Sequence, residues 1–211
     1  PLVGSRMAGL ALSSVDVVTL GRMQGAVPLG RYALASNVSS WPLGLLEPVL
    51  INVGLPLVSR LRRSQEQLRS FVELSVAATA GVFFLISATI AALAEPLVLA
   101  LYTAKWADAI PILSVLALAG FVRVFLTPFA DVLIACQATR AQMFVHLAWL
   151  VALIPATIVG VSLAGPLGAA YAQLGVVTLI VVPLTLAVVR RVAGTPLRAA
   201  LATAIHPLLS G

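Results

Sequence analysis

The sequence predicts an all-α, polytopic transmembrane helix bundle with about six spans, and three observations support this. Hydrophobic residues make up 61% of the 211 residues and charged residues only 9%, whereas about a quarter of the residues in a soluble domain are charged. Apolar stretches of roughly 20 residues, the length that crosses a bilayer as a helix, recur along the chain. The basic residues gather between these stretches, as orientation signals do.

The first half of the chain contains three of the predicted spans. They are expected at about 3–20, 32–58 and 71–93. The stretch GRMQGAVPLG, rich in glycine and proline, is expected to form a turn between the first two. A polar, arginine-rich loop over residues 60–69 is expected to separate the second span from the third.

The second half of the chain contains three more spans. They are expected at about 110–136, 143–163 and 169–189. Glu95 and Pro96 precede them and can start a short helix, because proline suits the first helical turn. The stretch AGPLG reads as a tight turn before the last span, and residues 196–209 could begin a seventh span that is cut short. No separate soluble domain is marked, so residues 1–211 are expected to form one transmembrane domain.

The distribution of basic residues predicts the orientation of the spans. If the N-terminal end is cytoplasmic, nine of the thirteen Lys and Arg residues fall on the inner side and three on the outer side. This excess predicts a multi-pass protein of the cytoplasmic membrane with both ends in the cytoplasm. The net charge of +6 is therefore read as an orientation signal, and no nucleic-acid partner is expected. The thirteenth basic residue, Arg123, belongs to no loop.

Motifs for metal binding or catalysis are missing from the sequence. The single cysteine, Cys136, allows no intrachain disulfide and no metal-site spacing. The chain contains neither a glycine-rich phosphate loop ending in Lys-Ser/Thr nor a nucleophile elbow. We therefore expect no cofactor, no metal and no enzymatic activity.

Four of the charged residues inside the predicted spans are considered as site residues. Glu47 and Arg123 lie near the middle of theirs, and Asp16 and Asp131 lie nearer the ends. A charge at the centre of a bilayer costs about 2.5–3.5 kcal/mol on insertion scales, so such residues face a bundle interior or a water-filled cavity. These four residues are therefore candidates for the lining of a cavity.

The span that contains Glu47 also contains small and polar residues at helical spacing. Ser36, Ser40 and Glu47 recur at four and seven residues, with Gly44 beside them, which places them on one stripe of a helix. Asn37 lies next to this stripe and can hydrogen-bond across helices. We predict that Glu47, Ser40 and Asn37 line a cavity. The alternative is that Glu47 is a neutral or paired acid that only joins helices.

Arg123 cannot discharge itself by losing a proton, so it needs an anionic partner, a water-filled cavity or an anionic ligand. Glu47 and Asp131 are candidate partners. Asp131 lies about two helical turns further on, too far for a direct bond but near enough to share a cavity. Arg123 could bind a phosphate or a sugar acid, because a guanidinium matches that geometry, or it could form a structural ion pair. Asp16 could line the same cavity or lie at the membrane interface.

Three stretches carry a resemblance to a known family. They are LGRYALA, then PLVSRL with its basic loop and LRSF, then EPLVLALYTAKWADAIPIL. Together they resemble the oligosaccharide flippases of the polysaccharide transporter family, within the multidrug/oligosaccharidyl-lipid/polysaccharide exporter superfamily. The resemblance implies that the chain is the C-terminal half of a fold of twelve or more helices, with the N-terminal half missing.

The resemblance also implies a function and partners. A lipid-linked oligosaccharide repeat unit would be flipped across the membrane for polysaccharide biosynthesis, in contact with membrane lipids. Arg123 would hold the negative charge of the head group, and Glu47 would take up or release a coupling proton. Two alternatives within this resemblance are a cation-coupled multidrug exporter and an inactive fragment. A membrane-embedded glycosyl- or acyltransferase would need a His/Asp/Glu cluster at the membrane face, which the sequence does not contain.

Overall fold

The computed structural model describes residues 2–41, 44, 65–136 and 138–193. Every regular element in these ranges is helical, which confirms the predicted all-α class. Glu47 and the possible seventh span, residues 196–209, lie outside the described residues, as does most of the predicted second span.

The first part of the described chain consists of long helices with short connections. Helix α1 (Leu2–Gln24) is followed directly by a helix over residues 26–41, and only Gly25, with φ of 81°, lies between them. The expected turn at GRMQGAVPLG is thus reduced to one residue, because the left-handed conformation of a glycine is enough to break the helix. Helix α3 (Gln65–Ala92) and the short helix α4 (Ala94–Leu101) come next.

The span expected at 110–136 is divided into two helices. A 3₁₀ helix, η1 (Ala104–Ala109), leads into α5 (Ile110–Phe125), and α6 (Thr127–Ala135) follows after Leu126. Pro128 lies in the first turn of α6, and its ring prevents α5 from continuing through this point. The division leaves Arg123 in the last turn of α5.

The last two predicted spans form a helical hairpin. Helix α7 (Thr139–Val176) is interrupted at Ala164 and Gly165, where the φ of Gly165 is 59°. This interruption falls in the AGPLG stretch and divides α7 into a first arm, residues 139–163, and a second arm, residues 166–176. A π-helical turn, η2 (Val177–Val181), and α8 (Val182–Ala193) extend the second arm.

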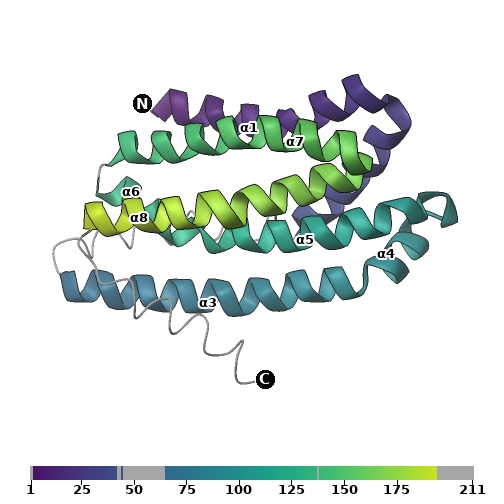
Figure 1. Ribbon diagram of the computed structural model, residues 1–211. Helices are drawn as coiled ribbons and strands as arrows, with labels where there is room; N and C mark the ends of the chain where they lie inside the picture. The colour runs from purple at the N-terminus through teal and green to yellow at the C-terminus, as the bar shows by residue number, and fades with distance from the viewer. Residues whose placement is uncertain (1, 42–43, 45–64, 137, 194–211) are drawn as a thin grey trace.

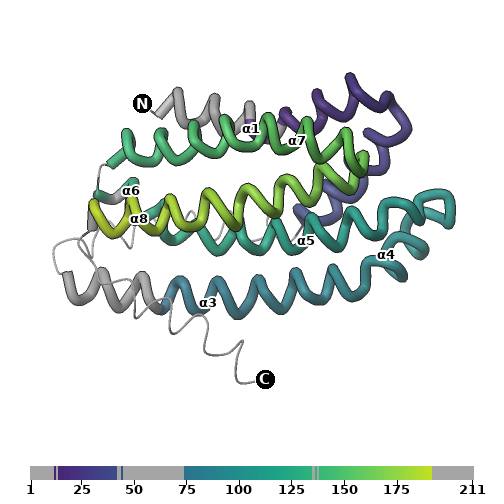
Figure 2. The backbone as a smooth tube through the Cα atoms, viewed as in Figure 1, coloured from purple at the N-terminus to yellow at the C-terminus, as the bar shows by residue number. Residues whose placement is uncertain are grey.

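The helices lie roughly side by side along one axis (Figures 1 and 2). Helix α1 packs along α7, α3 packs along α5, and α5 also contacts α7. Three segments of the described chain are long and apolar enough to cross a membrane: Leu74–Ala92, Ala104–Ile134 and Thr139–Arg191. The chain is therefore a multi-pass membrane protein.

The buried apolar side chains form two clusters within the bundle. One includes Leu20, Leu113, Val161 and Ala169, and the other includes Leu12, Phe129, Leu153 and Val177. Helices α1 and α7 supply residues to both clusters: α1 provides Leu12 to one and Leu20 to the other, about two helical turns apart. The residues of α1 between Leu12 and Leu20 therefore lie at the boundary between the two apolar clusters.

Candidate functional site

A layer of polar side chains separates the two apolar cores. Three helical segments show the same pattern, in which a polar residue lies four residues from a core residue on either side. The triples are Leu12–Asp16–Leu20 on α1, Leu153–Thr157–Val161 on the first arm of α7, and Ala169–Gln173–Val177 on the second arm. Residues four apart lie on one face of a helix. Asp16, Thr157 and Gln173 therefore face the same interior as the core residues beside them.

Asp16 is the centre of this polar layer. Its side chain is only 3% exposed. The hydroxyl of Tyr32 donates to Oδ2 at 2.6 Å, Nε2 of Gln173 donates to the same oxygen at 2.8 Å, and the hydroxyl of Thr157 donates to Oδ1 at 3.2 Å. An ionised carboxylate only accepts hydrogen bonds, and here every partner is a donor. The Asp16 carboxylate thus joins α1 to the helix over residues 26–41 and to both arms of α7.

A small polar cavity of about 60 Å³ lies beside this layer. Its lining comes from four helical segments and consists of Ser36, Ser39, Ser40, Phe83, Ser87, Leu116, Gly120, Arg123, Val124 and Gln173. Ser87 is 7% exposed, and its hydroxyl has no hydrogen-bond partner among the described residues. Gln173 belongs both to the cavity and to the Asp16 layer, so one amide separates the two.

Arg123 supplies the positive charge at this cavity. Its guanidinium carbon lies 5.5 Å from the centre of the Trp149 ring, a cation–π contact. Its charge also interacts electrostatically with Asp16 and Tyr32. Arg123 therefore stands between an aromatic face, a polar cavity and the carboxylate of the polar layer.

The other predicted site residues occupy different places. Ser40 lines the cavity and donates its hydroxyl to the carbonyl of Asn37 at 2.7 Å. Asn37 itself is exposed, and its Oδ1 accepts from the indole nitrogen of Trp41 at 3.0 Å. Asp131 is half-buried on α6 and is not part of the cavity lining. The structure thus brings Arg123 and Ser40 to one cavity, with Asp16 in the adjoining polar layer.

The sequence analysis missed three residues of the polar layer, Tyr32, Thr157 and Gln173. A signal for Thr157 and Gln173 was present, since each is flanked by apolar residues at four-residue spacing, as Asp16 is. Tyr32 could not be placed in the same way. Its contact with Asp16 depends on the one-residue break at Gly25, which was predicted as a longer turn.

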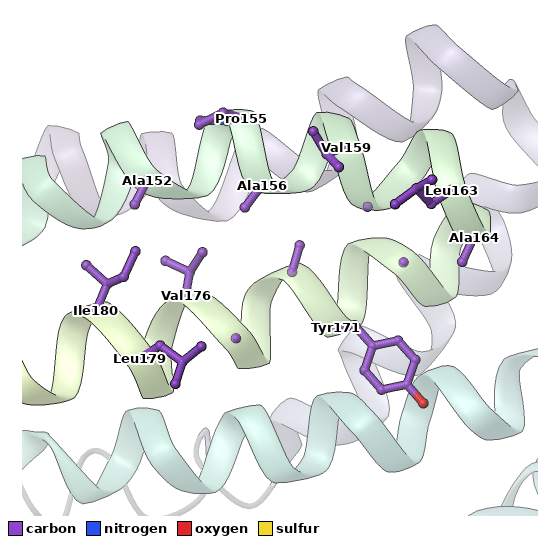
Figure 3. A pocket seen from close by; sticks show the side chains of 14 residues that line it. Ala152, Pro155, Ala156, Val159, Leu163, Ala164, Tyr171, Val176, Leu179 and Ile180 are labelled. Atoms are coloured by element: carbon purple, nitrogen blue, oxygen red, sulfur yellow. The ribbon is translucent and has the colours of Figure 1, made fainter.

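Another surface of the α7 hairpin is apolar and contains a close contact between two glycines. The two arms cross at Gly160 and Gly168, where a Cβ on either residue would overlap the carbonyl oxygen of the other. An open apolar groove of about 880 Å³ runs between the arms, and half of its lining residues are alanine or glycine, including Ala152 and Ala156 (Figure 3). This surface has no charged residue in its lining.

Comparisons with known proteins place this architecture in context. A family model described as "Polysaccharide biosynthesis protein" matches residues 1–111, just over half of the chain. The chain is 28% identical to the teichuronic acid biosynthesis protein TuaB of Bacillus subtilis over 133 residues, which are 63% of this chain and 28% of that protein.

Two other relatives have comparable similarity. The lipopolysaccharide biosynthesis protein WzxC of Escherichia coli is 24% identical over 74% of this chain and 32% of its own length. The succinoglycan biosynthesis transport protein ExoT of Rhizobium meliloti is 27% identical over 56% of this chain and 24% of its own length. The chain thus spans about a third or less of the length of these relatives, and no solved structure matches it.

Proposed function

This chain belongs to the polysaccharide biosynthesis protein family, and from that premise we propose that it forms part of a transporter. The transporter would flip lipid-linked oligosaccharide repeat units across the cytoplasmic membrane for the synthesis of a surface or exported polysaccharide. One relative carries the word "transport" in its name. The observation that carries the proposal is the position of Arg123, whose exposed side chain brings a permanent positive charge to the lining of a polar cavity in a membrane-spanning bundle.

A lipid-linked sugar needs a site of this kind. Its phosphate groups are negatively charged and must pass through an apolar bilayer, where an uncompensated charge is costly. A guanidinium offers several donors in a planar arrangement that suits phosphate oxygens. A cationic drug would be repelled by Arg123, so the cavity disfavours a multidrug exporter.

The size of the cavity suggests how the substrate would enter. At about 60 Å³ it holds roughly two water molecules, each of which occupies about 30 Å³ in the liquid. A sugar chain would need the four segments around the cavity to separate. Transporters commonly bind their substrates near the midplane between two structural halves. The proposed opposite wall is the N-terminal half of a longer transporter, with membrane lipids around both.

The remaining parts of the proposal concern orientation and chemistry. Both ends of the chain would lie in the cytoplasm, as the excess of basic residues on that side predicts. The activity would be transport rather than catalysis. Glu47 would take up a coupling proton or balance Arg123 between transport cycles, and Asp131 would contribute to the polar path near the other end of the span.

The proposal is tested with the full-length transporter in a strain that lacks it. Arg123→Ala should lower surface polysaccharide at least tenfold, equivalent to about 1.4 kcal/mol of lost stabilisation of the transport step. Arg123→Lys, which keeps the charge but not the planar geometry, should restore part of the activity. Arg22→Ala provides the control, since Arg22 is exposed at the end of α1 and outside the cavity lining. The proposal would be contradicted by a wild-type level of surface polysaccharide in cells whose membranes contain the Arg123→Ala protein at wild-type amounts.

A further inference from the structure

We infer that Arg123 is a counter-ion shared between the Asp16 carboxylate and an oxyanion bound at the cavity, so that binding of the anion is linked to uptake of one proton by Asp16. The inference rests on the proposed function, since the oxyanion is the diphosphate of a lipid-linked sugar. Of the two roles proposed above for Glu47, it leaves the balancing of Arg123, assigns the linked proton to Asp16, and gives a physical reason for the linkage.

The first step concerns the charge of Asp16. The three partners of its carboxylate all donate hydrogen bonds, which suits an ionised group. A buried negative charge inside a membrane bundle also needs a positive charge nearby. Among the described residues, Arg123 and Tyr32 are the ionisable groups that interact with Asp16, and Arg123 is the positive one. The hydrogen bonds from Tyr32 and Thr157, together with the charge of Arg123, therefore favour the ionised form of Asp16.

The second step concerns the cavity. Arg123 lines it together with Ser87, whose hydroxyl is without a partner among the described residues and is available to an entering ligand. Gln173 lines the same cavity and already donates to Asp16. An oxyanion held by Arg123 would thus be separated from the Asp16 carboxylate by little more than one amide side chain.

The third step follows from these two positions. When an anion binds, the guanidinium is balanced by the ligand and compensates Asp16 less well. The anion also repels the carboxylate directly. Both effects favour the neutral form of Asp16, so one proton passes from water to a carboxylate oxygen as the anion binds and returns to water when it leaves. Linkage is reciprocal, so protonation of Asp16 must strengthen anion binding by the same factor.

The test measures anion binding as a function of pH with the purified full-length transporter in lipid nanodiscs. The probe is a polyprenyl diphosphate monosaccharide, whose two phosphates are both esterified and keep a constant charge across the range. Affinity should rise about tenfold for each unit of falling pH over the interval in which one linked proton is taken up. Asp16→Asn should give a flat pH profile with affinity close to the low-pH value of the wild type.

Two controls make the result specific. Glu95→Gln removes an exposed acid on α4, outside the polar layer, and should leave the pH profile unchanged. A polyprenyl glycoside without phosphate should bind without pH dependence. A wild-type pH slope in Asp16→Asn, or a flat profile in the wild type, would overturn the inference.

The outcomes also separate this inference from the proposed function. If Arg123→Gln binds the diphosphate probe as tightly as the wild type, the proposed site itself is wrong. If Arg123→Gln weakens binding but the wild-type profile is flat, only the shared counter-ion is wrong.

Should Asp16→Asn fail to fold, Tyr32→Phe serves instead. It removes one donor to the ionised carboxylate, so the pH-dependent transition should move to higher pH, and an unchanged transition would contradict the inference.

Discussion

The α7 hairpin is held together differently on its two sides. On one side, Thr157 and Gln173 reach from separate arms to the same carboxylate of Asp16. On the other side, Gly160 and Gly168 let the two backbones touch without any side chain between them. The polar side is joined through side-chain hydrogen bonds, whereas the glycine side leaves no room for an added Cβ. The difference suggests that function lies in the first contact and rigidity in the second.

The largest expected effect comes from filling the glycine contact. Gly168→Ala places a methyl group against the carbonyl of Gly160, where neither backbone can yield locally. We expect the free energy of unfolding to fall by about 3 kcal/mol or more, at the upper end of the cost of overpacking. Titration of the purified protein with denaturing detergent measures this change.

Gly175→Ala is the matched control for that substitution. It lies on the same helix, and its added Cβ would have nothing within 4 Å. Alanine is the better helix former by about 1 kcal/mol, so this variant should be as stable as the wild type or more so. Equal losses in both variants would show that the hairpin does not depend on the close crossing.

An intermediate effect is expected from the polar layer. Asp16→Ala leaves three donors without their acceptor, and hydrogen bonds inside membrane proteins are worth about 0.6–1.7 kcal/mol each. The free energy of unfolding should therefore fall by roughly 2–5 kcal/mol. The same detergent titration measures it, with Asp131→Ala as control, because no described residue hydrogen-bonds Asp131. The polar layer has no structural role if the two variants lose equal stability.

The smallest effect is expected outside both regions, at the ion pair of Arg31 and Asp108. Their nitrogen and oxygen atoms are 2.8 Å apart, but the side chains are 35% and 64% exposed. Exposed pairs contribute about 0–1 kcal/mol. A double-mutant cycle with Arg31→Gln and Asp108→Asn should give a coupling energy in that range that decreases with added salt. A coupling energy larger than the effect of Asp16→Ala would reverse the ranking of the two sites.

The sequence predicts the fold class and the approximate places of the helices, because composition and apolar run length depend on local residues alone. It also identifies Arg123, Asp16 and Ser40 as polar residues in apolar surroundings. It does not predict that α5 ends before Pro128, since the span reads as one continuous apolar run. The grouping of Asp16 with Thr157 and Gln173 depends on how helices distant in sequence pack, which periodicity within one helix does not show.

The long sequence separations within the polar layer bear on how the protein is made. Tyr32 follows Asp16 by 16 residues, but Thr157 and Gln173 follow it by 141 and 157 residues. At about 5–20 residues per second, a ribosome needs roughly 8–30 seconds to supply the last partner. During that interval the newly inserted α1 holds an acidic side chain with one of its three donors in place. Biogenesis therefore passes through a stage in which Asp16 lacks the two donors that the α7 hairpin supplies.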